Sequence, residues 1–102
     1  MTESDFIILV IEDDPAIRRF LRTSLSIKGF TVFEADTGGR GVLEVDYRKP
    51  DLVILDLGLP DMEGIEVIKA IRMHSELPII ILSARSSEQS KIMALMPGPM
   101  II

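Results

Sequence analysis

The sequence predicts an α/β domain in which helices cover both faces of a doubly wound parallel sheet. Short apolar runs rich in β-branched residues alternate with segments of helical periodicity, and this alternation is typical of parallel strands joined by right-handed helical crossovers. The chain has 102 residues, of which 47% are hydrophobic, enough for one buried core but not for two. We therefore expect a single domain over residues 1–102.

The first strand is expected over residues 6–11, an unbroken apolar run of the kind found in strands buried on both faces. The run ends abruptly in three acidic residues, 12–14. Asp14 followed by Pro15 predicts a helix N-cap with proline at the first helical position. Apolar residues then recur at helical spacing until Gly29 supplies a stop signal. This region therefore predicts a strand, an acidic turn and a helix.

The same alternation continues along the chain and predicts three further strands and three further helices. The strands are expected over residues 30–35, 52–55 and 79–82, and the helices over residues 39–48, 65–71 and 87–95. Residues 96–102 contain two prolines, which break a helix, and they leave room for at most a stub of a fifth strand. The C-terminal strand and the helix after it are thus expected to be truncated or missing.

The composition excludes several classes of protein. A formal net charge of -5 is opposite to the basic excess that neutralises a nucleic-acid backbone, so this segment is not expected to bind nucleic acid directly. The absence of cysteine excludes a disulfide framework, a thiolate zinc site and a cysteine nucleophile. The N-terminus lacks the positive charge of a signal peptide, and the longest apolar run is too short to cross a bilayer. We expect a soluble cytoplasmic protein that makes no membrane contact.

Polar residues follow three of the predicted strands at the point where each strand ends. Glu12 and Asp13 follow the first strand, Asp56 follows the third and Ser83 follows the fourth. In open α/β sheets, ligands bind beyond the carboxyl ends of the strands, near the point where the strand order reverses. The predicted topology therefore gathers three carboxylates and a hydroxyl at one edge of the sheet.

Carboxylates held close together repel one another unless a cation offsets their charge. Oxygen ligands suit Mg²⁺, which takes one or two protein carboxylates and completes its coordination with water and phosphate oxygens. Such a site favours phosphoryl transfer, with Asp56 as the nucleophile and Glu12 and Asp13 as metal ligands. Ser83 is placed to donate a hydrogen bond to a phosphoryl oxygen, and Ala84 leaves space for the phosphoryl group to approach.

Several polar residues also have simpler interpretations. Asp14 is best explained as a helix cap rather than as a ligand. Gly58 is a plausible turn residue, although its backbone carbonyl is also a candidate metal ligand. Arg18, Arg19 and Arg22 are most simply interpreted as a solvated helix face.

Three motifs together resemble the receiver domain of bacterial two-component response regulators, and the resemblance covers residues 6–95. The motifs are residues 10–19 (Val-Ile-Glu-Asp-Asp-Pro-Ala-Ile-Arg-Arg), residues 50–61 (Pro-Asp-Leu-Val-Ile-Leu-Asp-Leu-Gly-Leu-Pro-Asp) with Gly64 following, and residues 78–85 (Pro-Ile-Ile-Ile-Leu-Ser-Ala-Arg). Within that family, residues 56–60 and 82–86 are most similar to the DNA-binding regulators of high-affinity potassium-transport genes.

The resemblance implies a CheY-like, flavodoxin-like fold and a signalling protein that at most phosphorylates and dephosphorylates its own aspartate. It implies an acid pair at Glu12 and Asp13, the phosphoacceptor at Asp56, a metal-binding carbonyl at Gly58 and a switch hydroxyl at Ser83. It also implies a sensor histidine kinase as phosphodonor, homodimerisation, and control of transcription through an output domain that this chain does not contain.

The sequence departs from the family pattern after residue 95. Residues 96–100 stand where the family has an Ala-Gly-Ala-Asp-Asp-like turn, and the lysine, aromatic residue and fifth helix that follow in the family are missing. One alternative is therefore a degenerate receiver that acts only as a protein interaction module. A second alternative is a metal-dependent phosphohydrolase, whose dehalogenase-like version places a second acid two residues after the nucleophile. Here Asp56 is followed by Leu57 and Gly58.

Overall fold

The computed structural model describes residues 6–82 and 100–101 of the chain. Strands and helices alternate along these residues, as the sequence predicts. In chain order the elements are β1 (Ile7–Ile11), α1 (Pro15–Ile27), β2 (Thr31–Ala35), α2 (Gly38–Arg48), β3 (Leu52–Asp56), α3 (Gly64–Arg72), β4 (Ile79–Leu82) and β5 (Met100–Ile101).

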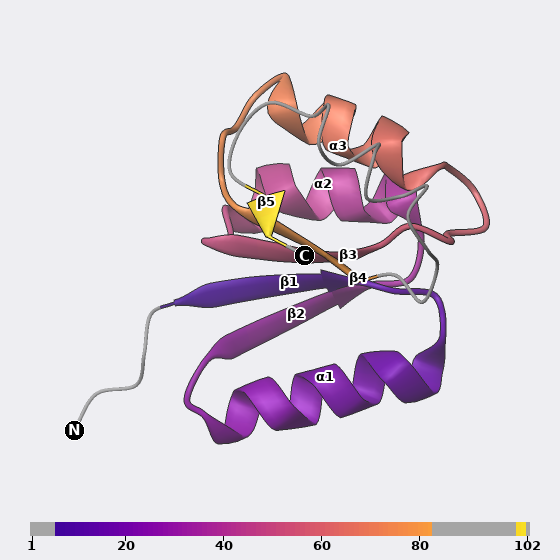
Figure 1. Ribbon diagram of the computed structural model, residues 1–102. Helices are drawn as coiled ribbons and strands as arrows, with labels where there is room; N and C mark the ends of the chain where they lie inside the picture. The colour runs from indigo at the N-terminus through magenta and orange to yellow at the C-terminus, as the bar shows by residue number, and fades with distance from the viewer. Residues whose placement is uncertain (1–5, 83–99, 102) are drawn as a thin grey trace.

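The strands form one parallel sheet in the order β2-β1-β3-β4-β5. After β1 the chain moves to one side to form β2, and it then returns past β1 to form β3. The strand order therefore reverses between β1 and β3, which confirms the doubly wound, flavodoxin-like topology. Figure 1 shows α1 on one face of the sheet and both α2 and α3 on the other.

The larger apolar core lies between the sheet and helices α2 and α3. Its centre includes Leu9, Leu55 and Ile68, each of which has no exposed surface. Helix α2 approaches β1 so closely that a Cβ atom on Gly41 would lie 2.4 Å from Cδ1 of Ile11. A glycine is therefore needed where this helix crosses the strand. Helix α2 thus packs closely against β1, the strand that precedes the acidic turn.

The smaller core, under α1, contains Ile8, Val10 and Ile54, with half-buried residues of α1 packed against them. Helix α1 itself contains no buried residue, and Phe20 keeps 68% of its surface exposed. The N-terminus of α1 is capped at the residue that the sequence predicted. The Asp14 carboxylate accepts the backbone N–H of Ala16 at 2.8 Å, which confirms the predicted N-cap.

The last turn of α1 ends slightly before the predicted stop. The helix ends at Ile27, and Gly29 follows with a φ of +96°, a conformation that favours glycine. Phe30 was expected to begin the next strand, but β2 begins one residue later, at Thr31. Phe30 instead donates its backbone N–H to the Leu25 carbonyl and belongs to the helix exit.

The C-terminal edge of the sheet is a short strand. Strand β5 has two residues, Met100 and Ile101, which pair with Ile79 and Ile80 of β4. This confirms the expected stub of a fifth strand, whose arrow is visible beside β4 in Figure 1. The helix expected over residues 87–95 lies outside the described residues. Within the part of the chain that the structure describes, no helix has the length and apolar character needed to cross a membrane.

Candidate functional site

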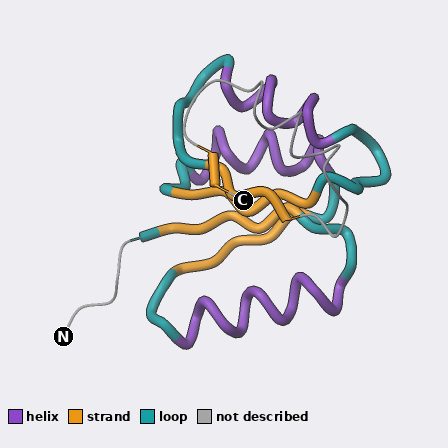
Figure 2. The backbone as a smooth tube through the Cα atoms, viewed as in Figure 1, coloured by secondary structure: helices purple, strands orange, loops and turns teal. Residues whose placement is uncertain are grey.

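The acidic turn after β1 lies beside the end of β3, where the strand order reverses. Ile11 pairs with Leu55 in the sheet, so the residues that follow them, Glu12 and Asp56, leave neighbouring strands at the same edge. One carboxylate oxygen from each of Glu12, Asp13 and Asp56 lies within 4.8 Å of the others. The structure thus brings together the three carboxylates that the sequence predicted to converge. Figure 2 shows the strand ends and the loops that follow them at this edge.

The three carboxylates differ in exposure. Glu12 is 3% exposed, Asp56 is half-buried and Asp13 is exposed. Burial raises the pKa of Glu12 from 4.5 to about 7, and the charge of Asp56 and a hydrogen bond with its side chain add to this effect. A hydrogen bond from the Asp14 N–H to Glu12 Oε2, 3.0 Å long, acts in the opposite direction. Burial and the neighbouring carboxylates therefore both disfavour the ionised form of Glu12.

Asp56 is held in place at the end of β3. Its backbone pairs with Leu82 of β4, and the N–H of Gly58 donates a hydrogen bond to Asp56 Oδ1 at 3.1 Å. One carboxylate oxygen is thus held by the backbone two residues ahead. Gly58 is exposed, and its N–H is a contact that the sequence did not indicate. The predicted residues Ser83 and Ala84 lie outside the described residues, directly after Leu82.

Arg18 contradicts the prediction of a solvated helix face. Its Nη1 donates to the backbone carbonyl of Glu12 at 2.8 Å and its Nε donates to Oε1 of Glu34 at 3.0 Å. Its side chain is only 21% exposed, whereas Arg22, which also pairs with Glu34 at 3.0 Å, is 52% exposed. The prediction was wrong for Arg18 because Glu34 lies on β2, and the contact depends on a strand register that helix periodicity does not reveal.

Asp61 is a second residue whose role the sequence did not indicate. Its carboxylate accepts the backbone N–H groups of Gly38 at 2.8 Å and Gly39 at 2.9 Å. These hydrogen bonds lower the pKa of Asp61. They also attach the loop that follows Asp56 to the first turn of α2. The partners are more than twenty residues apart in the sequence, so no local pattern reveals the contact.

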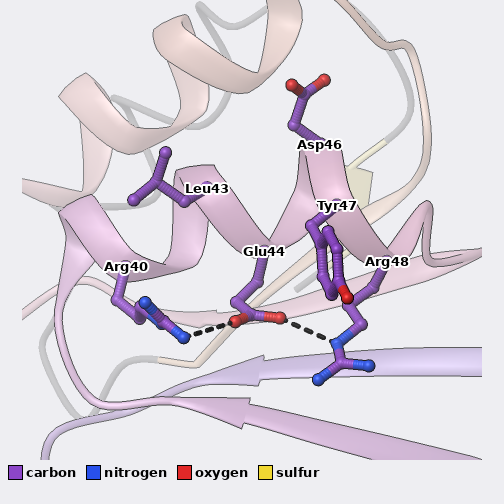
Figure 3. Close-up of a pocket in the computed structure, with 6 residues that line it drawn as sticks. All are labelled: Arg40, Leu43, Glu44, Asp46, Tyr47 and Arg48. Atoms are coloured by element: carbon purple, nitrogen blue, oxygen red, sulfur yellow. Dashed lines mark hydrogen bonds and ion pairs between the residues drawn. The ribbon is translucent and has the colours of Figure 1, made fainter.

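A separate hollow lies over the outer surface of α2. Figure 3 shows Glu44 between Arg40 and Arg48, with N–O distances of 3.1 and 3.0 Å, and Tyr47 beside Arg48. The Arg48 guanidinium also lies 4.0 Å from the centre of the Phe33 ring. Glu44 therefore pairs with two arginines of its own helix, and one of them, Arg48, lies against Phe33 of β2.

Comparison with known proteins identifies the family. The family model described as the response regulator receiver domain matches residues 8–100. The chain is 59% identical over 91 residues to KdpE, the KDP operon transcriptional regulatory protein of Escherichia coli, a match that covers 89% of this chain and 40% of that protein. It is 45% identical over 92 residues to the transcriptional regulatory protein KdpE of Mycobacterium tuberculosis, covering 90% of this chain and 41% of that protein. The chain thus spans about two fifths of the length of these relatives.

Solved structures show the same fold. A CheY-like response regulator receiver domain protein from Methanospirillum hungatei matches 96% of this chain and 81% of its own, with a TM-score of 0.84 and 30% identity. The response regulator protein TrrA from Thermotoga maritima, in complex with Mg(2+)-BeF, matches 95% of this chain and 85% of its own, with a TM-score of 0.83 and 31% identity. Proteins of this kind are signalling proteins that sensor histidine kinases phosphorylate. These matches confirm the resemblance carried by the three motifs, and the chain belongs to the response regulator receiver domain family, with KdpE-type regulators among its relatives.

Proposed function

We propose that this domain accepts a phosphoryl group on Asp56 in a reaction that depends on Mg²⁺ bound by Glu12, Asp13 and Asp56. The observation that supports the proposal most directly is the convergence of these three carboxylates, within 4.8 Å of one another, at the point where the strand order reverses. Three carboxylates at this spacing are a donor set of hard oxygen ligands, which is the kind that Mg²⁺ prefers.

The carboxylates fit the charge of a divalent cation. Burial chiefly raises the pKa of Glu12, and the neighbouring charges of Asp56 and Asp13 raise it further, so a cation beside these carboxylates would favour the ionised form of Glu12. Mg²⁺, when bound, offsets the charge of the carboxylates and of an approaching phosphoryl group. The backbone carbonyl of Gly58 is the fourth protein ligand in this proposal, because Gly58 lies two residues after Asp56 and is exposed.

The remaining roles in phosphoryl transfer are assigned to residues of the chain. One Asp56 oxygen accepts the Gly58 N–H, which orients the carboxylate so that an oxygen forms a bond to phosphorus as the bond to the donor's leaving group breaks. The product is an aspartyl phosphate. Ser83 donates its hydroxyl to a phosphoryl oxygen, and the small side chain of Ala84 leaves room for the group. Because the phosphoryl group stays on the protein, the chain turns over no substrate beyond its own aspartate.

Membership of the receiver domain family supports a proposal about the partners. We propose a sensor histidine kinase as the phosphodonor and homodimerisation as the response. Both named relatives are transcriptional regulatory proteins, more than twice as long as this chain. The proposal therefore extends to a cytoplasmic role in transcription, in which a different segment contacts DNA. The net charge of -5 makes direct nucleic-acid binding by this segment unfavourable.

The test is the intact mass of the protein after incubation with acetyl phosphate and Mg²⁺. We expect a single phosphoryl adduct on the unmodified chain and none on Asp56→Asn. Asp46→Asn is the matched control, because Asp46 lies on α2 with its side chain 78% exposed and should keep the adduct. A folded protein without any adduct would support the degenerate interaction module. Steady release of phosphate from an ester would instead support the phosphohydrolase.

A further inference from the structure

We propose that Arg18 is a positioning residue for the metal-binding acid pair, because its guanidinium, held by Glu34, holds the backbone carbonyl of Glu12. The inference rests on the proposed function, since it assumes that Glu12 and Asp13 bind Mg²⁺. It adds a residue on α1 and a residue on β2 to a site whose carboxylates lie at the ends of β1 and β3.

The Arg18 side chain connects α1 with β2 and with the acidic turn that follows β1. Its guanidinium donates through Nη1 to the Glu12 carbonyl at 2.8 Å and through Nε to Glu34 Oε1 at 3.0 Å. Both side chains of the ion pair are largely shielded, with exposed fractions of 21% for Arg18 and 24% for Glu34. Charge-assisted hydrogen bonds of this length in a shielded setting are stronger than exposed ion pairs. We call this pair the Arg18–Glu34 clamp.

The Glu12 carbonyl lies at the point where the chain leaves the hydrogen-bonded sheet. The N–H of Glu12 still donates to the Ala35 carbonyl of β2 at 3.0 Å. Beyond it, the Glu12 carbonyl and the Asp13 N–H belong to one planar peptide unit. Fixing the carbonyl therefore fixes the plane from which Asp13 extends. Since Asp13 is exposed, packing does not hold its side chain, and its position depends on this backbone.

The bridge needs the shape of arginine as well as its charge. Two donors of one rigid guanidinium are used at once, and they face acceptors on different parts of the chain. A lysine has a single ammonium on a flexible stem, so it retains the charge but does not hold both acceptors at a fixed separation. The Arg18→Lys variant therefore separates charge from geometry.

The chain offers a matched control in Arg22. Arg22 also lies on α1 and pairs with Oε2 of the same Glu34 at 3.0 Å. Among the described residues, Arg22 forms no hydrogen bond with the Glu12 backbone, and its side chain is more exposed, at 52%. Arg18→Met and Arg22→Met each remove one ion pair with Glu34, but only Arg18→Met removes the donor to the Glu12 carbonyl.

The experiment measures the dissociation constant for Mg²⁺ by calorimetric titration, together with phosphoryl uptake from acetyl phosphate as a function of Mg²⁺ concentration. Loss of a residue that orients a metal ligand weakens metal binding by about tenfold or more, and this is the change expected for Arg18→Met. For Arg22→Met we expect a change of less than about twofold. At saturating Mg²⁺ the uptake rate of Arg18→Met should return to within about threefold of the unmodified chain, because Asp56 is untouched.

Unfolding in urea with EDTA shows whether each variant is folded and how stable it is without metal. If Arg18→Met does not fold, Arg18→Lys replaces it, with an expected weakening of about threefold. Equal Mg²⁺ affinities for the Arg18 and Arg22 variants, in an unmodified chain that binds Mg²⁺ and accepts phosphate, would overturn the clamp and leave the proposed function intact. Absence of Mg²⁺ binding in the unmodified chain would overturn both.

Discussion

The two faces of the sheet are stabilised in different ways. On the face covered by α2 and α3, the apolar core is continuous, and Val67 and Ile68 of α3 are fully buried. On the opposite face, α1 has no buried residue, and its contacts with the sheet come from half-buried side chains such as Leu25. Polar contacts supplement this packing through the Asp14 cap and the Arg18–Glu34 clamp. The acidic turn leads directly into α1, so the proposed metal ligands Glu12 and Asp13 are adjacent to the face that depends more on specific polar contacts.

The largest expected effect tests the difference in packing. Ile68→Ala should lower the free energy of unfolding by about 3–4 kcal/mol, because it leaves a cavity in the closed core. Leu25→Ala, on α1, should lower it by about 1–2 kcal/mol, because its site is only half-buried and exposed surface relaxes more easily. Urea unfolding in EDTA measures both values. Equal losses would mean that α1 packs as tightly as α3, and the comparison of the two faces would fail.

The next effect concerns the charge of the acidic turn. Folding raises the pKa of Glu12 from 4.5 to about 7, so between these values the folded state binds more protons than the unfolded state. Without Mg²⁺, the free energy of unfolding should therefore fall as the pH rises from 4.5 to 7, by on the order of 1–3 kcal/mol. Glu12→Gln should flatten this slope and make the domain more stable at pH 8 in EDTA.

Mg²⁺ supplies the control for this prediction. A cation that binds the ionised carboxylates stabilises the folded state, and its binding competes with the proton on Glu12. The unmodified chain should therefore gain stability on addition of Mg²⁺ at pH 8 and gain less at pH 5.5, while Glu12→Gln should gain little at either pH. A pH-independent gain in the unmodified chain would contradict the assignment of Glu12 as a ligand.

The smallest effect compares the caps of the two helices that begin near the site. Asp14→Ala should lower the free energy of unfolding by about 1 kcal/mol, because it removes the side-chain cap of α1. Thr37, the N-cap of α2, accepts the Arg40 N–H, but Asp61 binds two further N–H groups of the same turn. Thr37→Ala should therefore cost only about 0.5 kcal/mol. Thermal unfolding of the two variants in parallel measures the difference, and a larger loss for Thr37→Ala would show that Asp61 does not share the capping role.

Local chemistry explains which features the sequence predicted. The Asp14 cap followed by Pro15, and the apolar strand β1, depend on neighbours in the sequence. The structure has the cap as expected, and β1 begins at Ile7, one residue later than predicted. The convergence of Glu12 and Asp56 was also predictable, because parallel strands in a doubly wound order end at one edge. The stub of β5 followed from the prolines before it.

The contacts that sequence analysis missed are those between distant segments. Arg18 meets Glu34 only because β2 pairs with β1 in one register, in which Val10 lies opposite Glu34. Asp61 reaches Gly38 and Gly39 only because the loop after β3 lies beside the start of α2. A charged side chain on a helix or in a loop has many solvent-exposed alternatives, and its actual partner depends on tertiary structure.

The reversal of strand order has a consequence for the kinetics of folding. Strand β3 reaches β1 across a long stretch of chain: Ile7 and Asp51, at the start of this pairing, exchange backbone and side-chain hydrogen bonds across a separation of 44 residues. We expect the closing of so long a loop to be slow and to precede any contact between Asp56 and the acidic turn. We therefore expect the proposed metal ligands to come together only after the central strands have paired. Mg²⁺ should consequently leave the folding rate nearly unchanged and slow unfolding instead, so that it stabilises the domain only after the domain has folded.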